Sequence, residues 1–222
     1  MAVLQTMSNY NLITRAGWNA RPPESVTPLK WSQVSRYIVH YSGEVRSQSV
    51  RSIQDFCMDS KGHSDIDYNM IVRGRDLNIG RGDNVGSHTL NNNSTSYGVC
   101  MIGTDGDATD DDFRTIRTWY DELCARIGKR LTMTTHRGVL GTNYTDCPGN
   151  ELQAWVDAEM PYPKTRSVID MFFGRLPDGS MYVCTGVASR YLPAEQLKLT
   201  IEPLEAAGVP RINYPDLTSL EA

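Results

Sequence analysis

The chain has 222 residues, of which 40% are hydrophobic and 22% are charged, and its formal net charge is -4. This composition is ordinary for a folded protein, and the length suffices for one sizeable domain with a small appendage. No long basic run favours nucleic acid as a partner, and no apolar stretch is long enough for stable membrane insertion. The first 18 residues lack the pattern of a signal peptide, so we expect synthesis and retention in the cytoplasm of the producing cell.

The five cysteines are scattered, and their odd number differs from the dense, even pattern of a secreted disulfide scaffold. Cys57, Cys100 and Cys124 fall within apolar patterns and are predicted to be core residues. Cys147 lies in a polar, glycine-rich segment instead, which sets it apart from the other three.

The first predicted elements lie between residues 13 and 62. Residues 13–23 read as a loop because glycine and proline interrupt them. Residues 37–39 form a short β-rich apolar segment, which predicts a buried strand ending at His40. A helix is predicted to begin at Ser47, as its N-cap, and to end at Gly62. Its apolar face is predicted to comprise Val50, Ile53, Phe56 and Cys57.

A hairpin and a further strand are predicted next. Residues 68–72 indicate a strand, 74–76 a turn and 77–80 a second strand. A polar loop over 91–96 leads into another buried strand over 97–102.

The clearest helix in the sequence begins with three consecutive aspartates at Asp110, which suit the positive end of the helix dipole. Gly128 and the two basic residues after it are predicted to end this helix. Its apolar stripe is predicted to comprise Phe113, Ile116, Tyr120, Leu123 and Ile127. An extended segment over 131–135 leads to His136, and a short helix is predicted over 151–159.

The character of the sequence changes after a predicted linker at residues 161–164. Beyond it we predict short strands over 171–174, 180–184 and 187–191, and a helix over 193–207. The sequence therefore predicts an α/β domain of residues 8–162, with a mixed central β-sheet flanked by helices, and a small C-terminal α+β module of residues 163–222.

Two of the four histidines, His40 and His136, are predicted to end strand-like segments, where α/β proteins commonly place functional sites. Cys147 follows His136 by eleven residues, through a segment that reads as a loop. Such a loop can bring an imidazole and a thiolate to one ion, and zinc accepts this mixture of ligands, with three protein ligands in catalytic sites. Spacing alone leaves open a core His40, a surface His136 and an inert Cys147.

Several motifs occur in a recognisable order. They are Arg15–Trp18, Val39–Ser42, Asp65–Asn69, Gly74–Gly82 with Gly86–His88, Ser96–Gly103, and His136 with Thr145–Gly149. From about residue 13 to residue 156, the chain thereby resembles the zinc amidase family shared by phage endolysins, bacterial N-acetylmuramoyl-L-alanine amidases and animal peptidoglycan recognition proteins. Six segments in register are a more specific signal than any single motif, and within the family the chain is most like a phage endolysin. The resemblance implies the family's α/β fold.

The resemblance implies a zinc ion held by His40, His136 and Cys147. Binding-only members of the family often lose the cysteine, so the presence of Cys147 favours catalysis. Zinc activates water near neutral pH and polarises a carbonyl group. The implied substrate is bacterial peptidoglycan, cut at the amide bond between the lactyl group of N-acetylmuramic acid and L-alanine.

Three further residues match positions near the site of this family. Tyr68 matches a tyrosine near the metal, which could donate to the oxyanion or orient the water. Thr145 matches a position that holds lysine or threonine, and it is a candidate second donor. His88 matches a histidine that lines the substrate groove, so we predict that it contacts substrate. Without the resemblance, Tyr68 reads as a half-buried strand aromatic and Thr145 as a loop residue.

The chain also departs from the family pattern. Tyr41 replaces a common second histidine, Asp67 replaces a frequent glycine, and His63 stands where an aromatic residue is usual. We assign His63 no role, and Asp67 puts the local strand geometry in doubt. No glutamate stands out as a general base, so activated water with Tyr68 has to suffice.

The sequence leaves three functions open. The first is an amidase acting as a phage endolysin, which a separate membrane protein would release to the cell wall. The second is a non-catalytic peptidoglycan-binding module. The third is a cysteine hydrolase with Cys147 as nucleophile and His136 as base. For the C-terminal module, binding to wall polymer, dimerisation and capping of the first domain all remain open.

Overall fold

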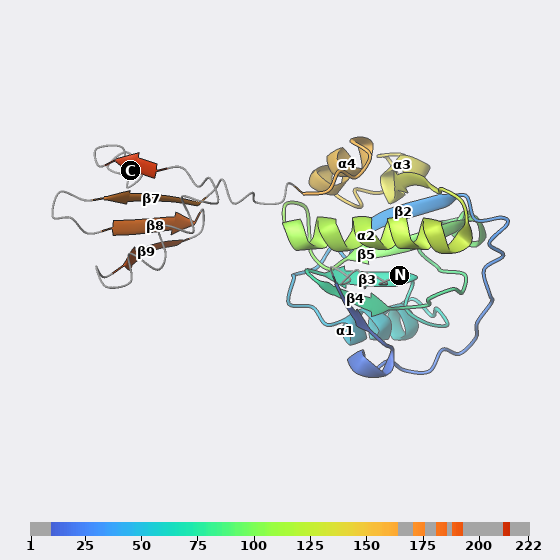
Figure 1. Ribbon diagram of the computed structural model, residues 1–222. Helices are drawn as coiled ribbons and strands as arrows, with labels where there is room; N and C mark the ends of the chain where they lie inside the picture. Colours follow the sequence, from blue (N-terminus) through green and yellow to red (C-terminus); the bar gives the residue numbers. More distant parts are fainter. Residues whose placement is uncertain (1–9, 164–170, 176–180, 186–187, 193–210, 214–222) are drawn as a thin grey trace, which may run out of the picture. The chain divides into compact units, whose positions relative to one another are not determined.

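The chain falls into two compact units, residues 1–163 and 164–222. A computed structural model of the protein describes residues 10–163, 171–175, 181–185, 188–192 and 211–213 (Figure 1). The boundary between the units lies one residue beyond the position that the sequence suggests. None of the helices in the described residues combines the length and the apolar character that a membrane span requires.

A six-stranded mixed sheet forms the centre of the first unit, in the order β1-β4-β3-β5-β2-β6. The strands are β1 (Asn11–Ile13), β2 (Arg36–Tyr41), β3 (Met70–Arg73), β4 (Asp76–Ile79), β5 (Ser96–Met101) and β6 (Thr132–Thr135). Neighbouring strands run parallel except β3 and β4, which form the predicted antiparallel hairpin. The predicted α/β class with a mixed central sheet is therefore confirmed.

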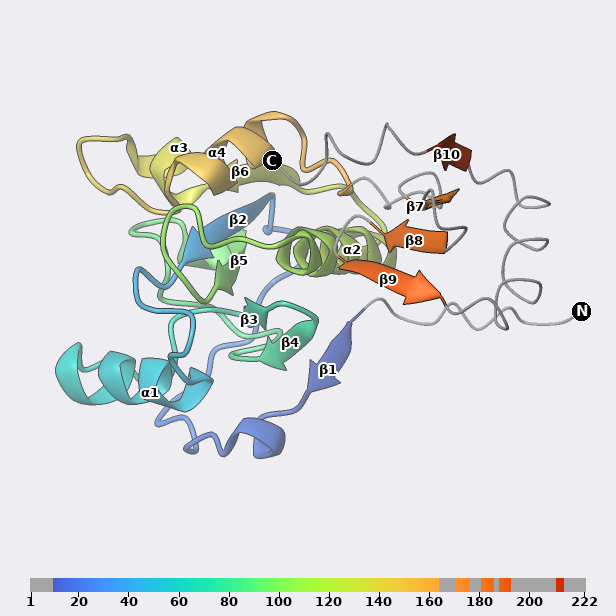
Figure 2. The ribbon, with the colours of Figure 1, turned by 90° about the vertical axis from the view of Figure 1, so that its left-hand side faces the viewer.

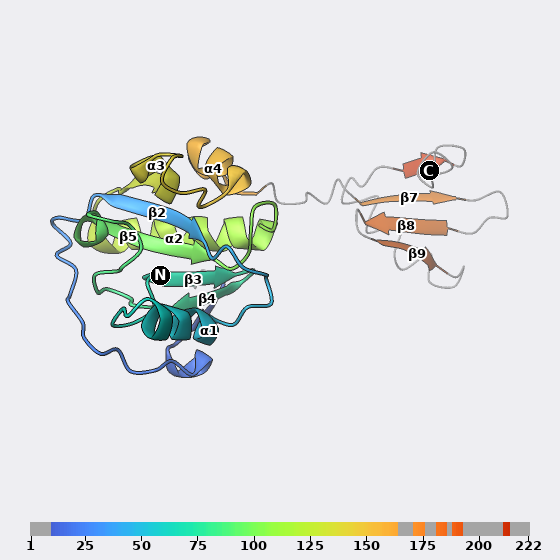
Figure 3. The ribbon, with the colours of Figure 1, turned by 180° about the vertical axis from the view of Figure 1, so that it is seen from behind.

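Helices cover both faces of this sheet (Figures 2 and 3). They are α1 (Val50–Asp55), α2 (Asp110–Ile127), α3 (His136–Leu140) and α4 (Asn150–Asp157), with short helical turns η1 (Ala16–Trp18), η2 (Phe56–Ser60) and η3 (Asn93–Thr95). Successive strand residues point to opposite faces. In β3, Val72 belongs to the core under α2, whereas Ile71 belongs to the core under α1.

Helix α2 follows its prediction closely. Thr109 caps it and forms a capping box with Asp112, and Gly128 ends it in the left-handed conformation at φ 69°. The buried Asp112 carboxylate also pairs with Arg46 at 2.9 Å. On the inner side, Ile116 and Tyr120 are buried against the sheet, as their helical spacing predicts.

Helix α1 departs from its prediction in two ways. Its N-cap is Ser49, whose side chain accepts a hydrogen bond from the backbone N–H of Ser52, and not Ser47. Phe56 is 54% exposed and does not belong to the buried face. The reason is the helix phase, because a helix that begins at Val50 buries positions three, four and seven residues further on, and Phe56 is six residues on.

The strand limits near the hairpin also differ from the prediction. Asn11–Ile13 forms the edge strand β1, although Ile13 was assigned to a loop, because this segment pairs with β4 more than 60 residues away in the sequence. The strand predicted to begin at Tyr68 begins at Met70. Tyr68 therefore lies in the segment that precedes β3, where its backbone carbonyl accepts a hydrogen bond from the N–H of Arg81 at 2.9 Å.

The second unit contains a four-stranded sheet in the order β10-β7-β8-β9. Its strands are β7 (Met171–Arg175), β8 (Met181–Thr185), β9 (Ala188–Leu192) and β10 (Arg211–Asn213). The three predicted strands are confirmed to within one residue, and β10, which pairs parallel with β7, was not predicted. The helix predicted over 193–207 lies outside the described residues.

Candidate metal centre

His40, His136 and Cys147 converge at one end of the parallel strands. His40 lies near the end of β2, and His136 directly follows β6, which pairs with β2 in parallel register. The two imidazole ring centroids are 4.8 Å apart. Sγ of Cys147 lies 3.6 Å from Nδ1 of His40. One donor atom from each of the three side chains lies within 4.8 Å of the other two.

The loop after α3 carries Cys147, and backbone hydrogen bonds tie it to the helix. The N–H of Arg137 donates to the carbonyl of Cys147 at 2.9 Å, and the N–H of Cys147 donates to the Thr145 hydroxyl at 3.1 Å. At the other side of the loop, the Thr135 hydroxyl caps α3 by accepting from the N–H of Gly138 at 2.8 Å. These contacts hold the thiol next to the two imidazoles.

Burial sets the protonation of all three groups. It lowers the pKa of His40 well below the usual value, with help from His88 and His136 nearby. Burial also lowers the pKa of His136, and the Lys61 ammonium adds to this effect. Both imidazoles are therefore neutral at pH 7, with a lone pair free for a metal. Burial raises the pKa of the Cys147 thiol to about 12, so the thiolate needs a neighbouring cation.

The donor set fits zinc. Two imidazole nitrogens and one thiolate are typical zinc ligands, and three protein ligands leave a fourth position for water or substrate. The sulfur of Cys147 is within hydrogen-bonding distance of Nδ1 of His40 and of the carbonyl of Tyr41, at 3.6 and 3.9 Å. A cysteine nucleophile activated by His136 would need a thiolate that this burial disfavours.

Tyr68 and Thr145 are placed beside this cluster. The Tyr68 ring centroid lies 5.2 Å from that of His40. Burial raises the pKa of Tyr68 well above its usual value, so its hydroxyl keeps its proton and remains a donor. The Thr145 hydroxyl accepts from the N–H of Cys147, and its own proton is available for a further partner. Their assignment to catalysis stays a prediction.

His88 lies on the other side of His40. Nδ1 of His88 is 3.1 Å from Nε2 of His40. His88 is buried, with 5% of its surface exposed. The predicted contact with substrate stays a prediction, and the structure adds a direct contact between the two imidazoles that the sequence did not indicate.

Comparison with known proteins bears on this site. The model of the family described as N-acetylmuramoyl-L-alanine amidase matches residues 30–150, which is more than half of the chain. The chain belongs to this amidase family. The matched range contains His40, His136 and Cys147, together with Tyr68, His88 and Thr145.

Relatives of this amidase-family chain include peptidoglycan-recognition protein SC2 of Drosophila simulans, which is 29% identical over 68% of the chain and 89% of the relative. The human N-acetylmuramoyl-L-alanine amidase is 35% identical over 47% of the chain and 19% of the relative. Among solved structures, peptidoglycan recognition protein LE in complex with tracheal cytotoxin has a TM-score of 0.59 and 26% identity, over 66% of the chain and 92% of that structure.

A hollow of about 160 Å³ adjoins the amidase-family site. Tyr68 lines it together with Lys61 and Glu44, and the exposed ring of Phe56 forms part of its wall. The Lys61 ammonium lies 5.4 Å from the centroid of the Phe56 ring. Sequence analysis did not identify Lys61 or Glu44, because each stands outside the motifs that the family resemblance uses.

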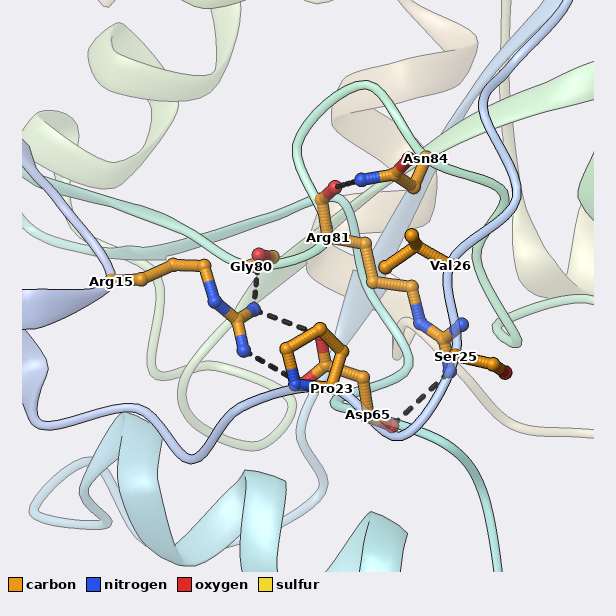
Figure 4. A pocket seen from close by; sticks show the side chains of 8 residues that line it. All are labelled: Arg15, Pro23, Ser25, Val26, Asp65, Gly80, Arg81 and Asn84. Carbon is orange, nitrogen blue, oxygen red and sulfur yellow. Dashed lines mark hydrogen bonds and ion pairs between the residues drawn. The ribbon is translucent and has the colours of Figure 1, made fainter.

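A smaller cavity of about 60 Å³ is lined by two arginines that hold the surrounding segments together (Figure 4). One guanidinium nitrogen of Arg15 donates to the carbonyl of Gly80 at 2.6 Å and pairs with Asp65 at 2.9 Å. The Arg81 guanidinium donates to the carbonyls of Ile66 and Asp65 at 2.6 and 3.2 Å. These arginines tie the family's Arg15–Trp18 motif and the β4 end to the segment that carries Tyr68.

Proposed function

We propose that this chain is a zinc-dependent N-acetylmuramoyl-L-alanine amidase, which hydrolyses the amide bond between the lactyl group of N-acetylmuramic acid and L-alanine in peptidoglycan. The observation that carries the proposal is the convergence of His40, His136 and Cys147 within 4.8 Å in a chain of the amidase family. When bound there, zinc would supply an activated water and polarise the amide carbonyl.

The hydroxyl groups of Tyr68 and Thr145, beside the three metal ligands, would then stabilise the negative charge that develops on the carbonyl oxygen. As the carbonyl carbon is attacked, its oxygen gains negative charge, and the Tyr68 hydroxyl is a protonated donor for it. The Thr145 hydroxyl is a second, uncharged donor. Cleavage of the C–N bond leaves the oxygen of water on the lactyl carboxylate, and both protons of that water end on the nitrogen of L-alanine, which departs as an ammonium group.

Substrate would extend from the reacting amide into the hollow beside Tyr68. Lys61 and Glu44 offer one positive and one negative side chain there, which suits a peptide that carries both amino and carboxyl groups. The predicted contact of His88 with substrate belongs to the same proposal.

Digestion of purified cell walls tests the activity. We expect new L-alanine amino termini without new reducing sugars, loss of activity with a chelator, and recovery when zinc is added. Cys147→Ser should abolish activity, whereas Cys124→Ser, which changes a buried cysteine in α2, should retain it. New reducing sugars, or full activity of the Cys147→Ser variant, would overturn the proposal.

A second candidate is recognition of peptidoglycan without hydrolysis. Its support is that relatives of the chain include peptidoglycan-recognition proteins, one of them solved with a bound peptidoglycan fragment. A protein of this kind would bind walls in the presence of a chelator and release no new amino termini.

We also propose the role of a phage endolysin, which is supported only by the resemblance of the sequence motifs to that branch of the family. It requires that the amidase reaches the wall from the cytoplasm of the producing cell with the help of a separate membrane protein. Co-expression with and without such a protein, followed by the optical density of the culture, tests this. For the unit of residues 164–222, wall binding, dimerisation and capping of the first unit are alternatives. A wall-sedimentation assay that compares the full chain with a chain ending at Pro163 tests the first of them.

A further inference from the structure

The His40 ring is held between two different partners. Its Nδ1 faces the sulfur of Cys147 at 3.6 Å, and its Nε2 faces Nδ1 of His88 at 3.1 Å. His40 and His88 are 1% and 5% exposed, so water does not compete freely for either nitrogen. Nδ1 of His40 is therefore the nitrogen that faces the metal site, and Nε2 is the nitrogen that contacts His88.

The contact between the two imidazoles restricts where their protons lie. A neutral His40 that offers the lone pair of Nδ1 to a metal carries its proton on Nε2. That N–H can donate only to an acceptor, so Nδ1 of His88 must be unprotonated and its proton must lie on Nε2. The Thr89 hydroxyl lies 3.0 Å from the same Nδ1 and competes with His40 for its single lone pair.

We propose that His88 is a positioning residue, which fixes the tautomer and the ring orientation of His40 for metal binding. A partner for the second N–H of a histidine ligand commonly sets both properties. This proposal rests on the proposed zinc function, and it differs from the predicted contact of His88 with substrate.

The surroundings of His88 are shaped to accept its ring. A Cβ atom at Gly98 in β5 would lie 2.5 Å from Cγ and Cδ2 of His88, and one at Gly86 would lie 2.4 Å from Cδ2. Gly98 is the register partner of Ile38, two residues before His40 in β2, so the missing side chain leaves room beside His40 on that face of the sheet. The two glycines thus make a slot whose occupant is the His88 ring.

Nε2 of His88 is buried, and its surroundings indicate that the contact of His88 with His40 is made by Nδ1. Within the described residues it has no hydrogen-bond partner. Burial of an N–H group without a partner is unfavourable, and such groups are rare in folded proteins. An apolar side chain would fill the slot without this cost. The presence of an imidazole is therefore explained by the hydrogen bond that Nδ1 of His88 accepts from His40.

The test compares His88→Asn with His88→Leu. The two replacement side chains have nearly the same size, but Asn offers an acceptor oxygen at about the position of Nδ1, and Leu offers none. Zinc affinity of the full chain is measured by competition with a chelator, without substrate, and cobalt(II) absorption reports the ligand geometry. Thermal unfolding of the metal-free variants shows whether each of them is folded.

We expect His88→Leu to weaken zinc binding by about 10- to 100-fold, the usual effect of losing such a partner, and to change the cobalt spectrum. His88→Asn should stay much closer to the wild type. If His88→Leu does not fold, Gly98→Ala, which displaces the ring without removing it, should weaken zinc binding in the same way. Wild-type zinc affinity in His88→Leu or Gly98→Ala, or equal losses in His88→Asn and His88→Leu, would overturn the proposal.

The outcome can be separated from that of the proposed function. If the wild type binds zinc and the variants behave as expected, but walls are not hydrolysed, His88 positions His40 in a protein that is not an amidase. If the variants change only KM for wall fragments and leave zinc affinity intact, His88 contacts substrate and the positioning role is wrong.

Discussion

Nδ1 of His63 lies 2.6 Å from Oδ1 of Asp67, so two residues that both depart from the family pattern are direct partners. Lys61 contacts the other oxygen of the same carboxylate at 3.1 Å. Asp67 is 2% exposed, and a buried carboxylate is stable when its oxygens are paired and hydrogen-bonded. The paired departures explain how a carboxylate is accommodated next to Tyr68 in place of glycine.

Removal of one of these partners should destabilise the fold. In Lys61→Met, the Asp67 carboxylate stays buried and keeps His63 as its side-chain partner, so we expect a loss of about 1–3 kcal/mol in the free energy of unfolding. Urea unfolding of zinc-free protein measures this. Lys30→Met, at an exposed lysine, is the control, and a Lys61 variant as stable as this control would show that the ion pair contributes nothing.

Zinc uptake should release about one proton at pH 6. The Cys147 thiol, with a pKa of about 12, is protonated before binding and is a thiolate afterwards. His40 releases none, because burial lowers its pKa well below the usual value, and His136, whose pKa burial also lowers, adds only a fraction of a proton. At pH 6, a water on zinc stays largely protonated. Calorimetric titration in two buffers of different ionisation enthalpy measures the proton count, and zero or two protons would contradict this assignment.

The sequence was sufficient to predict those parts of the site that depend on local pattern and on family motifs. The short β-rich apolar segment before His40 predicts a strand end, and the motif around Cys147 predicts a loop that returns to His136. The order of the motifs then selects these three ligands from four histidines and five cysteines. The structure brings the three together as predicted.

Other features depend on contacts between distant segments, which no local pattern specifies. The pairing of His40 with His88 joins residues 48 apart and requires the space left by Gly98. The edge strand β1 exists because β4 is beside it. The correct N-cap, Ser49 and not Ser47, depends on which turn of α1 packs on the sheet, and both serines are equally suitable caps by residue type.

Acid should destabilise the metal-free protein. Burial lowers the pKa of His88 to about 3, and burial also lowers the pKa values of His40 and His136 below that of an exposed histidine, near 6.5. Below pH 6.5 the unfolded chain takes up protons that the folded chain does not, so the free energy of unfolding falls as the pH falls. The stability is fully present above pH 6.5 and is lost towards pH 3.

Each such histidine contributes a slope of up to about 1.4 kcal/mol per pH unit in this window. Urea unfolding between pH 7 and pH 4 measures the total slope. His88→Asn removes one of the titrating groups, so its slope should be smaller than that of the wild type. An identical slope in this variant would mean that His88 does not stay neutral in the folded state.

Tyr68→Phe separates catalysis from metal binding. The variant loses the protonated hydroxyl beside His40 and keeps the ring, so kcat for wall hydrolysis should fall by about 100- to 1000-fold, as for the loss of an oxyanion donor. Zinc affinity and the unfolding temperature should match the wild type, because the hydroxyl is not one of the three metal donors. Tyr162→Phe, at an exposed tyrosine that bonds Asp121 in α2, is the matched control and should keep full activity. A Tyr68→Phe variant with wild-type kcat would remove Tyr68 from the chemistry, and one that loses zinc together with activity would place its role in the metal centre instead.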